Sequence, residues 1–176
     1  AAASIAQVHK ALIDVDGVSR TVALKVLRPN IESKIKRDLK DFYLAAKILE
    51  KLSSEARRLR VIDVVRTLEE SLSMEIDLRL EAAAQSEIIE NTQEDKFIEI
   101  PKVFWDLTSK NILTTEWVEA NSSKNLKEIK KKNIEFNVVG ENIMKTFLIL
   151  AIRDGFFHAD MHQGNIFIKD DATIIP

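Results

Sequence analysis

The stretch His158-Ala159-Asp160-Met161-His162-Gln163-Gly164-Asn165 lies between a helix-like apolar segment and the strand-like residues 166–168. An aspartate five residues before an asparagine in such a loop is the spacing that phosphoryl-transfer enzymes use. There the acid orients the attacking hydroxyl or water, and the amide oxygen holds Mg²⁺. Gly164 permits a tight turn between the two groups. Asp160 is therefore a candidate catalytic residue and Asn165 a candidate metal ligand.

The same loop has two other interpretations. His158, Asp160 and His162 could cap a helix and fill a turn, or His-x-Asp-x-His could bind zinc. Zinc is disfavoured because no glutamate stands at the position that a zincin helix requires, and these residues are not expected on a helix. The aspartate–asparagine spacing is short and common, so its meaning depends on the other motifs of the chain.

A lysine interrupts the apolar strand pattern Val22-Ala23-Leu24-Lys25-Val26. A buried ammonium group is costly unless it is paired, so Lys25 would need an anion such as a nucleotide phosphate and a helix glutamate. Alternatively, Lys25 could lie on the solvent face of an edge strand. Glu81 offers a partner on a helix predicted from residues 63 to 89, with Asp77 on the same face and Glu75 rotated away. These three acids could equally form a solvated helix face.

The first residues of the chain are small: Ala1-Ala2-Ala3-Ser4-Ile5-Ala6 leads into a predicted strand. Small side chains let a backbone approach a ligand closely, as in the phosphate-binding loop of a kinase. Alanine lacks the φ freedom of glycine, so this loop would be stiffer than a glycine-rich one. By itself the segment could also be the start of a helix.

Composition excludes several classes of protein. The 176 residues are 45% hydrophobic and 31% charged, an ordinary balance for one domain or two small lobes. The 26 basic and 28 acidic residues nearly cancel, so nothing favours nucleic acid as a partner. The absence of cysteine excludes disulfides, thiolate catalysis and zinc–thiolate sites. The chain begins without methionine and stops within a strand pattern, so we expect a piece of a longer protein.

Hydrophobic periodicity predicts an order of elements that suits a two-lobed α+β fold. A polar, lysine-rich segment at 121–133, including Lys130 to Lys132, receives no function. The expected elements are a hairpin over 6–13 and 18–27, a helix over 31–52, a polar link at 57–60, a helix over 63–89 capped by Asp63, a strand pair at 99–104 and 111–118, a helix over 138–152, and a loop with short strands over 156–176.

Taken in chain order, these motifs resemble those of a protein kinase, and in detail the chain is similar to the UbiB family of atypical kinase-like proteins. That family includes the coenzyme Q accessory ATPases of bacteria and mitochondria. Four matches carry the resemblance: residues 1–9 match its alanine-rich loop, 22–26 its strand lysine, 75–83 its ExD helix and 158–165 its catalytic loop.

The resemblance implies a protein-kinase-like fold that binds ATP or ADP with Mg²⁺, with an N-lobe over residues 1–118 and a linker and partial C-lobe over 119–176. Lys25 would pair with Glu81 and contact phosphates, Asp160 would be the catalytic aspartate, and Asn165 a metal ligand. Glu75 and Asp77 would form the occluding ExD motif. The residues implied to contact nucleotide are Ala2, Ala3, Ser4, Ile5, Ala6, Lys25, Glu116 and Val118.

The resemblance also implies an ATPase rather than a protein kinase, which supports ubiquinone biosynthesis at a membrane. Partners would be a quinone-precursor lipid, biosynthetic proteins and the membrane surface, at the bacterial inner membrane or the mitochondrial matrix side. The family's KxGQ and D-F-G segments are not in this chain, so the fragment alone is expected to be inactive. Met161 and Gln163 replace prolines common in the family's loop. Two alternatives are a non-catalytic scaffold that senses nucleotide or lipid, and a phosphotransferase of the aminoglycoside or choline kinase type.

Overall fold

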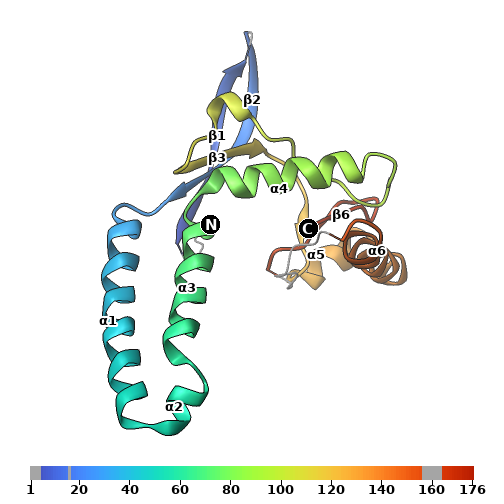
Figure 1. The fold of residues 1–176 in the computed structure, drawn as a ribbon. Helices are drawn as coiled ribbons and strands as arrows, with labels where there is room; N and C mark the ends of the chain where they lie inside the picture. The colour runs from blue at the N-terminus through green and yellow to red at the C-terminus, as the bar shows by residue number, and fades with distance from the viewer. Residues whose placement is uncertain (1–4, 16, 156–163) are drawn as a thin grey trace.

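A sheet, a projecting helical hairpin and a smaller second lobe make up the molecule (Figure 1). The structure is a computed structural model, and it describes residues 5–15, 17–155 and 164–176. The helix α4 (Leu78–Asn91) crosses beneath the sheet and leads toward the second lobe (Figure 1). The observed architecture confirms the predicted α+β, two-lobed organisation.

The first sheet is antiparallel, with the order β1-β2-β3. It contains β1 (Ala6–Val15), β2 (Val18–Leu27) and β3 (Ile112–Glu116), so the predicted hairpin is confirmed. The predicted strand at 99–104 is wrong, because Val103 makes only an isolated bridge to Thr115. Pro101 has no N–H to donate to a strand ladder, which disfavours a continuous strand there.

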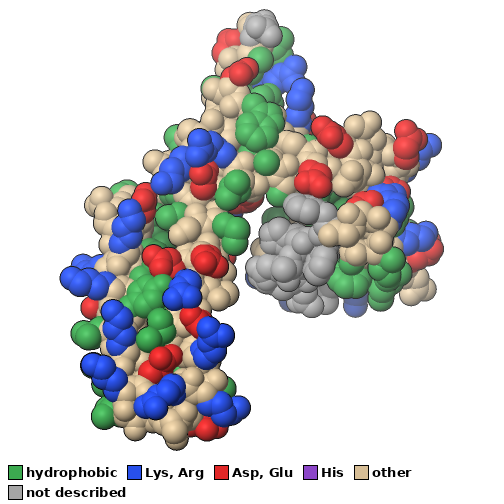
Figure 2. All heavy atoms as spheres, viewed as in Figure 1, with side chains coloured by type: hydrophobic (Ala, Val, Ile, Leu, Met, Phe, Trp, Pro, Cys, Tyr) green, Lys and Arg blue, Asp and Glu red, His purple; other side chains and the backbone are tan. Residues whose placement is uncertain are grey.

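The helical hairpin consists of α1 (Ile31–Leu52), α2 (Ser54–Arg58) and α3 (Val61–Glu75). Its long helices run side by side away from the sheet, and Lys and Arg side chains gather over this limb (Figures 1 and 2). Leu39, Ala46 and Val65 form a small core between the helices. The polar link predicted at 57–60 is wrong in part, since Ser53 accepts a hydrogen bond from the Ala56 N–H and α2 forms there.

The single helix predicted over 63–89 is also wrong. Helix α3 begins at Val61, ahead of the expected cap Asp63, and ends at Glu75, while α4 begins at Leu78. Asp77 causes the break, because its carboxylate accepts a hydrogen bond from the Arg79 N–H at 3.1 Å and so caps α4. The apolar periodicity continues across this turn, which explains why the sequence pattern hides it.

The second lobe has a small sheet, two helices and its own core. The sheet contains β4 (Asn121–Ser122), β5 (Phe167–Ile168) and β6 (Ile174–Ile175), and the helices are α5 (Leu126–Lys131) and α6 (Phe136–Leu148). A π-helical turn, Ile149–Arg153, follows α6. The core residues are Ile129, Ile134, Val139, Ile166, Ile168, Ala172 and Ile174. The helix predicted over 138–152 is thus present, although its last turn is π-helical.

Contacts at the end of α4 join the two lobes. Ile88 packs with Ile98 and Leu150, and the Glu99 N–H donates to the Ile174 carbonyl at 2.9 Å. The boundary predicted at residue 118 stays a prediction; it falls between β3 and β4, which belong to different sheets. In the described part of the chain, no helix combines the length and apolar character needed to cross a membrane.

Candidate functional site

The central feature of the candidate site is an ion pair between β2 and α4. The Lys25 Nζ lies 2.8 Å from Glu81 Oε1 and 2.6 Å from Oε2. The two side chains are 28% and 42% exposed, so the pair is half-buried and open to solvent on one side. Because β2 is the central strand of its sheet, Lys25 does not lie on an edge strand.

The cross-strand register places Lys25 on the sheet face that α4 covers. Lys25 lies opposite Val8 of β1 and Leu113 of β3, and directly opposed residues point to the same face. Ala23, two residues before Lys25, shares this face and lies opposite Thr115. Small and apolar side chains therefore surround the lysine along the three strands.

A buried apolar cluster fixes the distance between β2 and α4. Leu78 and Ala82 of α4 are almost completely buried on either side of Glu81 along the helix. The Leu78 N–H also donates to the Lys110 carbonyl at 3.0 Å, which ties the start of α4 to the turn before β3. The cluster contains Ala6, Leu27, Ile76, Leu78, Ala82, Val103 and Leu113. Close packing of these groups holds the Glu81 carboxylate within reach of Lys25.

Glu75 and Asp77 lie at the turn between α3 and α4 rather than on one helix face. Glu75 is the exposed last residue of α3. Asp77 accepts hydrogen bonds from Arg79 Nε at 2.9 Å and Nη2 at 2.7 Å. These bonds from Arg79 lower the pKa of Asp77 to about 2, so the carboxylate is charged at neutral pH. The prediction that Asp77 lies on the helix four residues before Glu81 is wrong, because Asp77 is the cap of α4.

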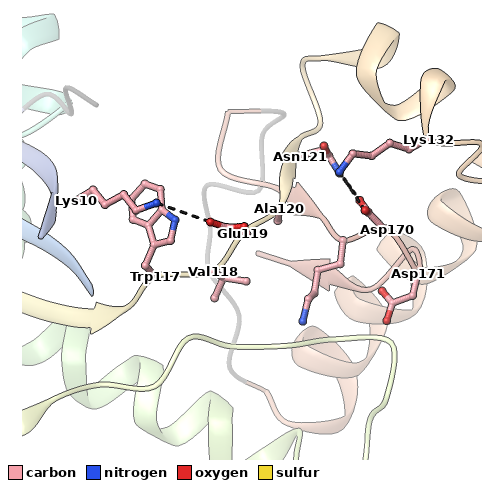
Figure 3. Close-up of a pocket in the computed structure, with 10 residues that line it drawn as sticks. Lys10, Trp117, Val118, Glu119, Ala120, Asn121, Lys132, Asp170 and Asp171 are labelled. Carbon is pink, nitrogen blue, oxygen red and sulfur yellow. Dashed lines mark hydrogen bonds and ion pairs between the residues drawn. The ribbon is translucent and has the colours of Figure 1, made fainter. Parts of the chain in front are cut away.

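A cavity of about 660 Å³ lies beside the segment that joins β3 to β4. Figure 3 shows Trp117, Val118 and Glu119 of this segment near Lys10 of β1. The Lys10 Nζ lies 4.7 Å from the centroid of the Trp117 ring and 3.8 Å from the Glu119 carboxylate. Val118 lines this cavity as well, whereas Glu116, its predicted companion, is exposed at the end of β3.

The far wall of the cavity comes from the turn between β5 and β6. Lys132 binds Asp170 at 2.7 Å, and Asn121 Nδ2 donates to the same carboxylate at 3.0 Å, as Figure 3 shows in part. Lys132 and then Asn121 lower the pKa of Asp170. Lys169 binds Glu99 at 2.7 Å, which raises the pKa of Lys169. Both lobes thus contribute charged groups to the cavity.

Several predicted residues fall outside the described part of the chain: Ala2, Ala3, Ser4, His158, Asp160 and His162. Ile5 and Ala6 are described, and Ala6 is fully buried opposite Leu27. Asn165 is half-buried directly before the buried Ile166. Its amide oxygen suits Mg²⁺, yet the described residues contain no group of three acidic or histidine side chains around it. The role of Asn165 as a metal ligand therefore stays a prediction.

Sequence reasoning missed the cation–ring contact of Lys10 with Trp117. Lys10 lies on the same face of β1 as Val8, and Trp117 directly precedes the predicted Val118. The position of Trp117 is a usable signal, because it lies between the predicted nucleotide contacts Glu116 and Val118. Their mutual contact depends on the tertiary fold, because Lys10 lies on β1, Trp117 follows β3, and β2 lies between these two strands in the sheet.

A three-stranded antiparallel sheet with a central lysine bonded to a helix glutamate, joined to a second lobe, defines a protein-kinase-like fold. A model of the ABC1 atypical kinase-like domain matches residues 1–176, and the chain belongs to this family. The predicted resemblance is confirmed.

Curated relatives and a solved structure agree with this family. The chain is 35% identical over 176 residues to a "Probable protein kinase UbiB" of Pseudomonas paraeruginosa, and covers 32% of that protein. It is 39% identical over 168 residues to the protein of the same name from Marinobacter nauticus, covering 96% of this chain and 30% of the relative. The chain thus spans about a third of these relatives. The structure of Rv3197 with erythromycin, from Mycobacterium tuberculosis, matches with a TM-score of 0.81 and 28% identity, over 99% of this chain and 42% of Rv3197.

Proposed function

We propose that this chain is the nucleotide-binding core of a Mg²⁺-dependent ATPase or phosphotransferase. The ion pair of Lys25 with Glu81 carries the proposal, because it anchors an ammonium group on the covered face of the sheet. An ammonium has three N–H donors, and two bonds to Glu81 leave one for a phosphate oxygen of ATP or ADP. Glu81 would hold Lys25 in place, and Val118 would contact the base.

The chemistry would come from the loop before β5. Asp160 would orient the attacking hydroxyl or water, and Asn165 would hold Mg²⁺. When bound, the metal supplies positive charge that offsets the charge of the transferred phosphoryl group. A site that only binds nucleotide has no need of an aspartate at this spacing, which favours catalysis over a scaffold.

In the full-length protein this core would support ubiquinone biosynthesis. The relatives named UbiB support that part of the proposal. A quinone-precursor lipid, biosynthetic proteins and a membrane surface would be its partners, at the bacterial inner membrane or the mitochondrial matrix side. Glu75 and Asp77 would restrict access to the nucleotide site.

Nucleotide binding can be tested by thermal unfolding of the full-length protein with Mg²⁺ and ADP or ATP. We expect the melting temperature to rise with nucleotide, because a ligand of the native state stabilises it. Lys25→Ala should abolish the rise, while Lys110→Ala, which removes a lysine paired with Glu32 in the same lobe, should preserve it. A rise that persists in Lys25→Ala would place the nucleotide elsewhere.

Turnover needs a separate measurement. Asp160→Asn should abolish ATP hydrolysis and leave the nucleotide-induced rise in melting temperature intact. Equal hydrolysis by this variant and the unaltered protein would contradict the catalytic assignment. Nucleotide binding without hydrolysis in the unaltered protein would support the scaffold instead.

A small-molecule phosphotransferase is a second candidate, favoured by the erythromycin bound to Rv3197. If it is correct, adding a macrolide with ATP should accelerate ADP release and yield a phosphorylated macrolide. ADP release that is unaffected by the macrolide would favour the first proposal.

A further inference from the structure

Four lysines form a row along α1 of the helical hairpin. Lys36, Lys40, Lys47 and Lys51 are all exposed. At 100° per residue their spacings of four, seven and four place them within an arc of roughly 60° on one face. At about 1.5 Å per residue the row is roughly 22 Å long.

Most of this positive charge is not neutralised inside the molecule. Lys36 binds Glu32 at 2.9 Å, but within the described ranges Lys40, Lys47 and Lys51 make no hydrogen bond or ion pair. The groove beside the row also contains Asp41 and Glu69. Glu69 accepts a hydrogen bond from the Tyr43 hydroxyl at 2.7 Å instead of from a lysine.

Exposed leucines accompany the lysines. Leu44 lies on the same face and is 61% exposed, and Leu52, at the end of α1, is 81% exposed. Leu59, beyond α2, is 57% exposed at the same end of the hairpin. Arg57 and Arg58 of α2 add basic groups there, although Arg58 is paired with Glu55. The far end of the limb therefore combines apolar and cationic side chains (Figure 2).

We propose that this face of α1, from Lys36 to Lys51 with Leu44, docks the protein on an anionic lipid surface. Lysines on a helix attract anionic headgroups, and the neighbouring Leu44 would enter the boundary between headgroups and acyl chains. The inference deepens the membrane part of the proposed function and does not depend on the nucleotide site.

The shape of the surface favours a lipid layer over a nucleic acid or an acidic protein. The row lies along a limb that projects from the body, so a planar surface can reach it (Figure 1). The exposed Phe42 of α1 is rotated well away from the row. Tyr43 lies in the groove with the lysines, but it packs against the hairpin core and its hydroxyl donates to Glu69, so its ring offers no open stacking platform. The chain carries a net charge of −2, so the row is a local feature rather than part of a basic protein.

Docking can be measured at the hairpin itself with a polarity-sensitive fluorophore. The chain contains no cysteine, so Leu44→Cys, beside the lysine row and at a position that is 61% exposed, provides a labelling position in it. In the full-length protein, we expect the label to shift to the blue with vesicles containing about 30% phosphatidylglycerol, and not with pure phosphatidylcholine. A label on Met144→Cys, which is 58% exposed on α6, should not respond. An equal response of both labels, or to both vesicles, would overturn the proposal.

Charge reversal provides a matched pair of variants. The triple variant Lys40→Glu, Lys47→Glu and Lys51→Glu should bind the anionic vesicles at least about 100-fold more weakly, measured as the lipid concentration that gives half of the full shift. Each lysine near an anionic membrane strengthens binding roughly fivefold. Reversal of Lys127, Lys130 and Lys131 on α5 changes the net charge equally and should leave the shift intact. Equal weakening by both sets, or a response to RNA or polyglutamate in place of vesicles, would refute the lipid face.

The two proposals can fail separately. The α1 variants should keep the nucleotide-induced rise in melting temperature, because the row lies on the hairpin and not on β2 or α4. Far-UV circular dichroism of both charge-reversed proteins should match the unaltered protein, since all six lysines are exposed.

Discussion

Lys25 and Glu81 should behave as a coupled pair when they are neutralised separately and together. The three variants are Lys25→Met, Glu81→Gln and the double substitution, compared by urea denaturation. The Nζ–Oε distances of 2.6 and 2.8 Å are short, but the side chains are 28% and 42% exposed. Water therefore screens the pair, and we expect a coupling energy for unfolding of roughly 1 kcal/mol rather than several.

The same substitutions should change nucleotide affinity more than they change stability, and Lys25→Met should have a larger effect than Glu81→Gln. A hydrogen bond from an ammonium to a phosphate contributes about 1.5–3 kcal/mol, and solvent exposure favours the lower end. Lys25→Met should therefore weaken Mg²⁺–ADP binding at least about tenfold. Glu81→Gln should weaken it less, because Glu81 acts by positioning Lys25. The double variant should bind no more weakly than Lys25→Met alone.

Isothermal titration of the full-length proteins at fixed salt would measure these affinities. Additive losses in the double variant would refute the reasoning, since they would mean that Glu81 does not act through Lys25. An unchanged affinity in Lys25→Met would refute the phosphate contact itself. Replacement of Lys110 by methionine serves as the control, because Lys110 pairs with Glu32 at 3.2 Å and lies on the turn before β3.

Two further predictions concern the packing of α4. Arg79 lowers the pKa of Asp77 from 3.8 to about 2, so the contribution of Asp77 to stability is complete above pH 3.8 and is lost as the pH falls toward 2. Across this pH range the melting temperature of Asp77→Asn should therefore fall less steeply than that of the unaltered protein. Leu78→Ala should lower the free energy of unfolding by about 3 kcal/mol, because Leu78 is 1% exposed. Leu80→Ala in the same helix, at 52% exposure, should change it by less than about 0.5 kcal/mol in urea denaturation. A similar loss from both leucine variants would contradict the assigned packing.

The sequence predicts the elements whose side chains alternate or repeat locally. The β1–β2 hairpin and α1 follow directly from such patterns. The break at Asp77 does not, since a capping carboxylate looks the same as any acid on a solvated helix face until its Arg79 N–H partner is known. The strand expected at 99–104 does not form because Pro101 has no N–H for a strand ladder, although Lys102 and Phe104 exchange backbone hydrogen bonds with Glu116 and Thr114 of β3.

The candidate site is predictable residue by residue but not as an arrangement. Lys25 inside an apolar strand indicates that some anion is needed, and only the resemblance to known kinases selects Glu81. The cavity beside Val118 is a different case, because Lys10 meets Trp117 across separate elements. No periodic pattern encodes such a contact, which depends on the sheet order β1-β2-β3.

The helical hairpin explains how two residues 56 positions apart can form one site. Lys25 precedes α1 and Glu81 follows α3, so the whole hairpin is inserted between the partners. Closing a flexible loop of that length costs conformational entropy, which rises with the logarithm of its length. Because α1 and α3 pack on each other, the hairpin returns the chain to its starting point, and Ile31 and Ile35 pack against the same cluster as Ile76 and Leu78. The insertion therefore acts as a folded spacer with a short effective span, and it leaves its exposed lysine face free to carry a separate function.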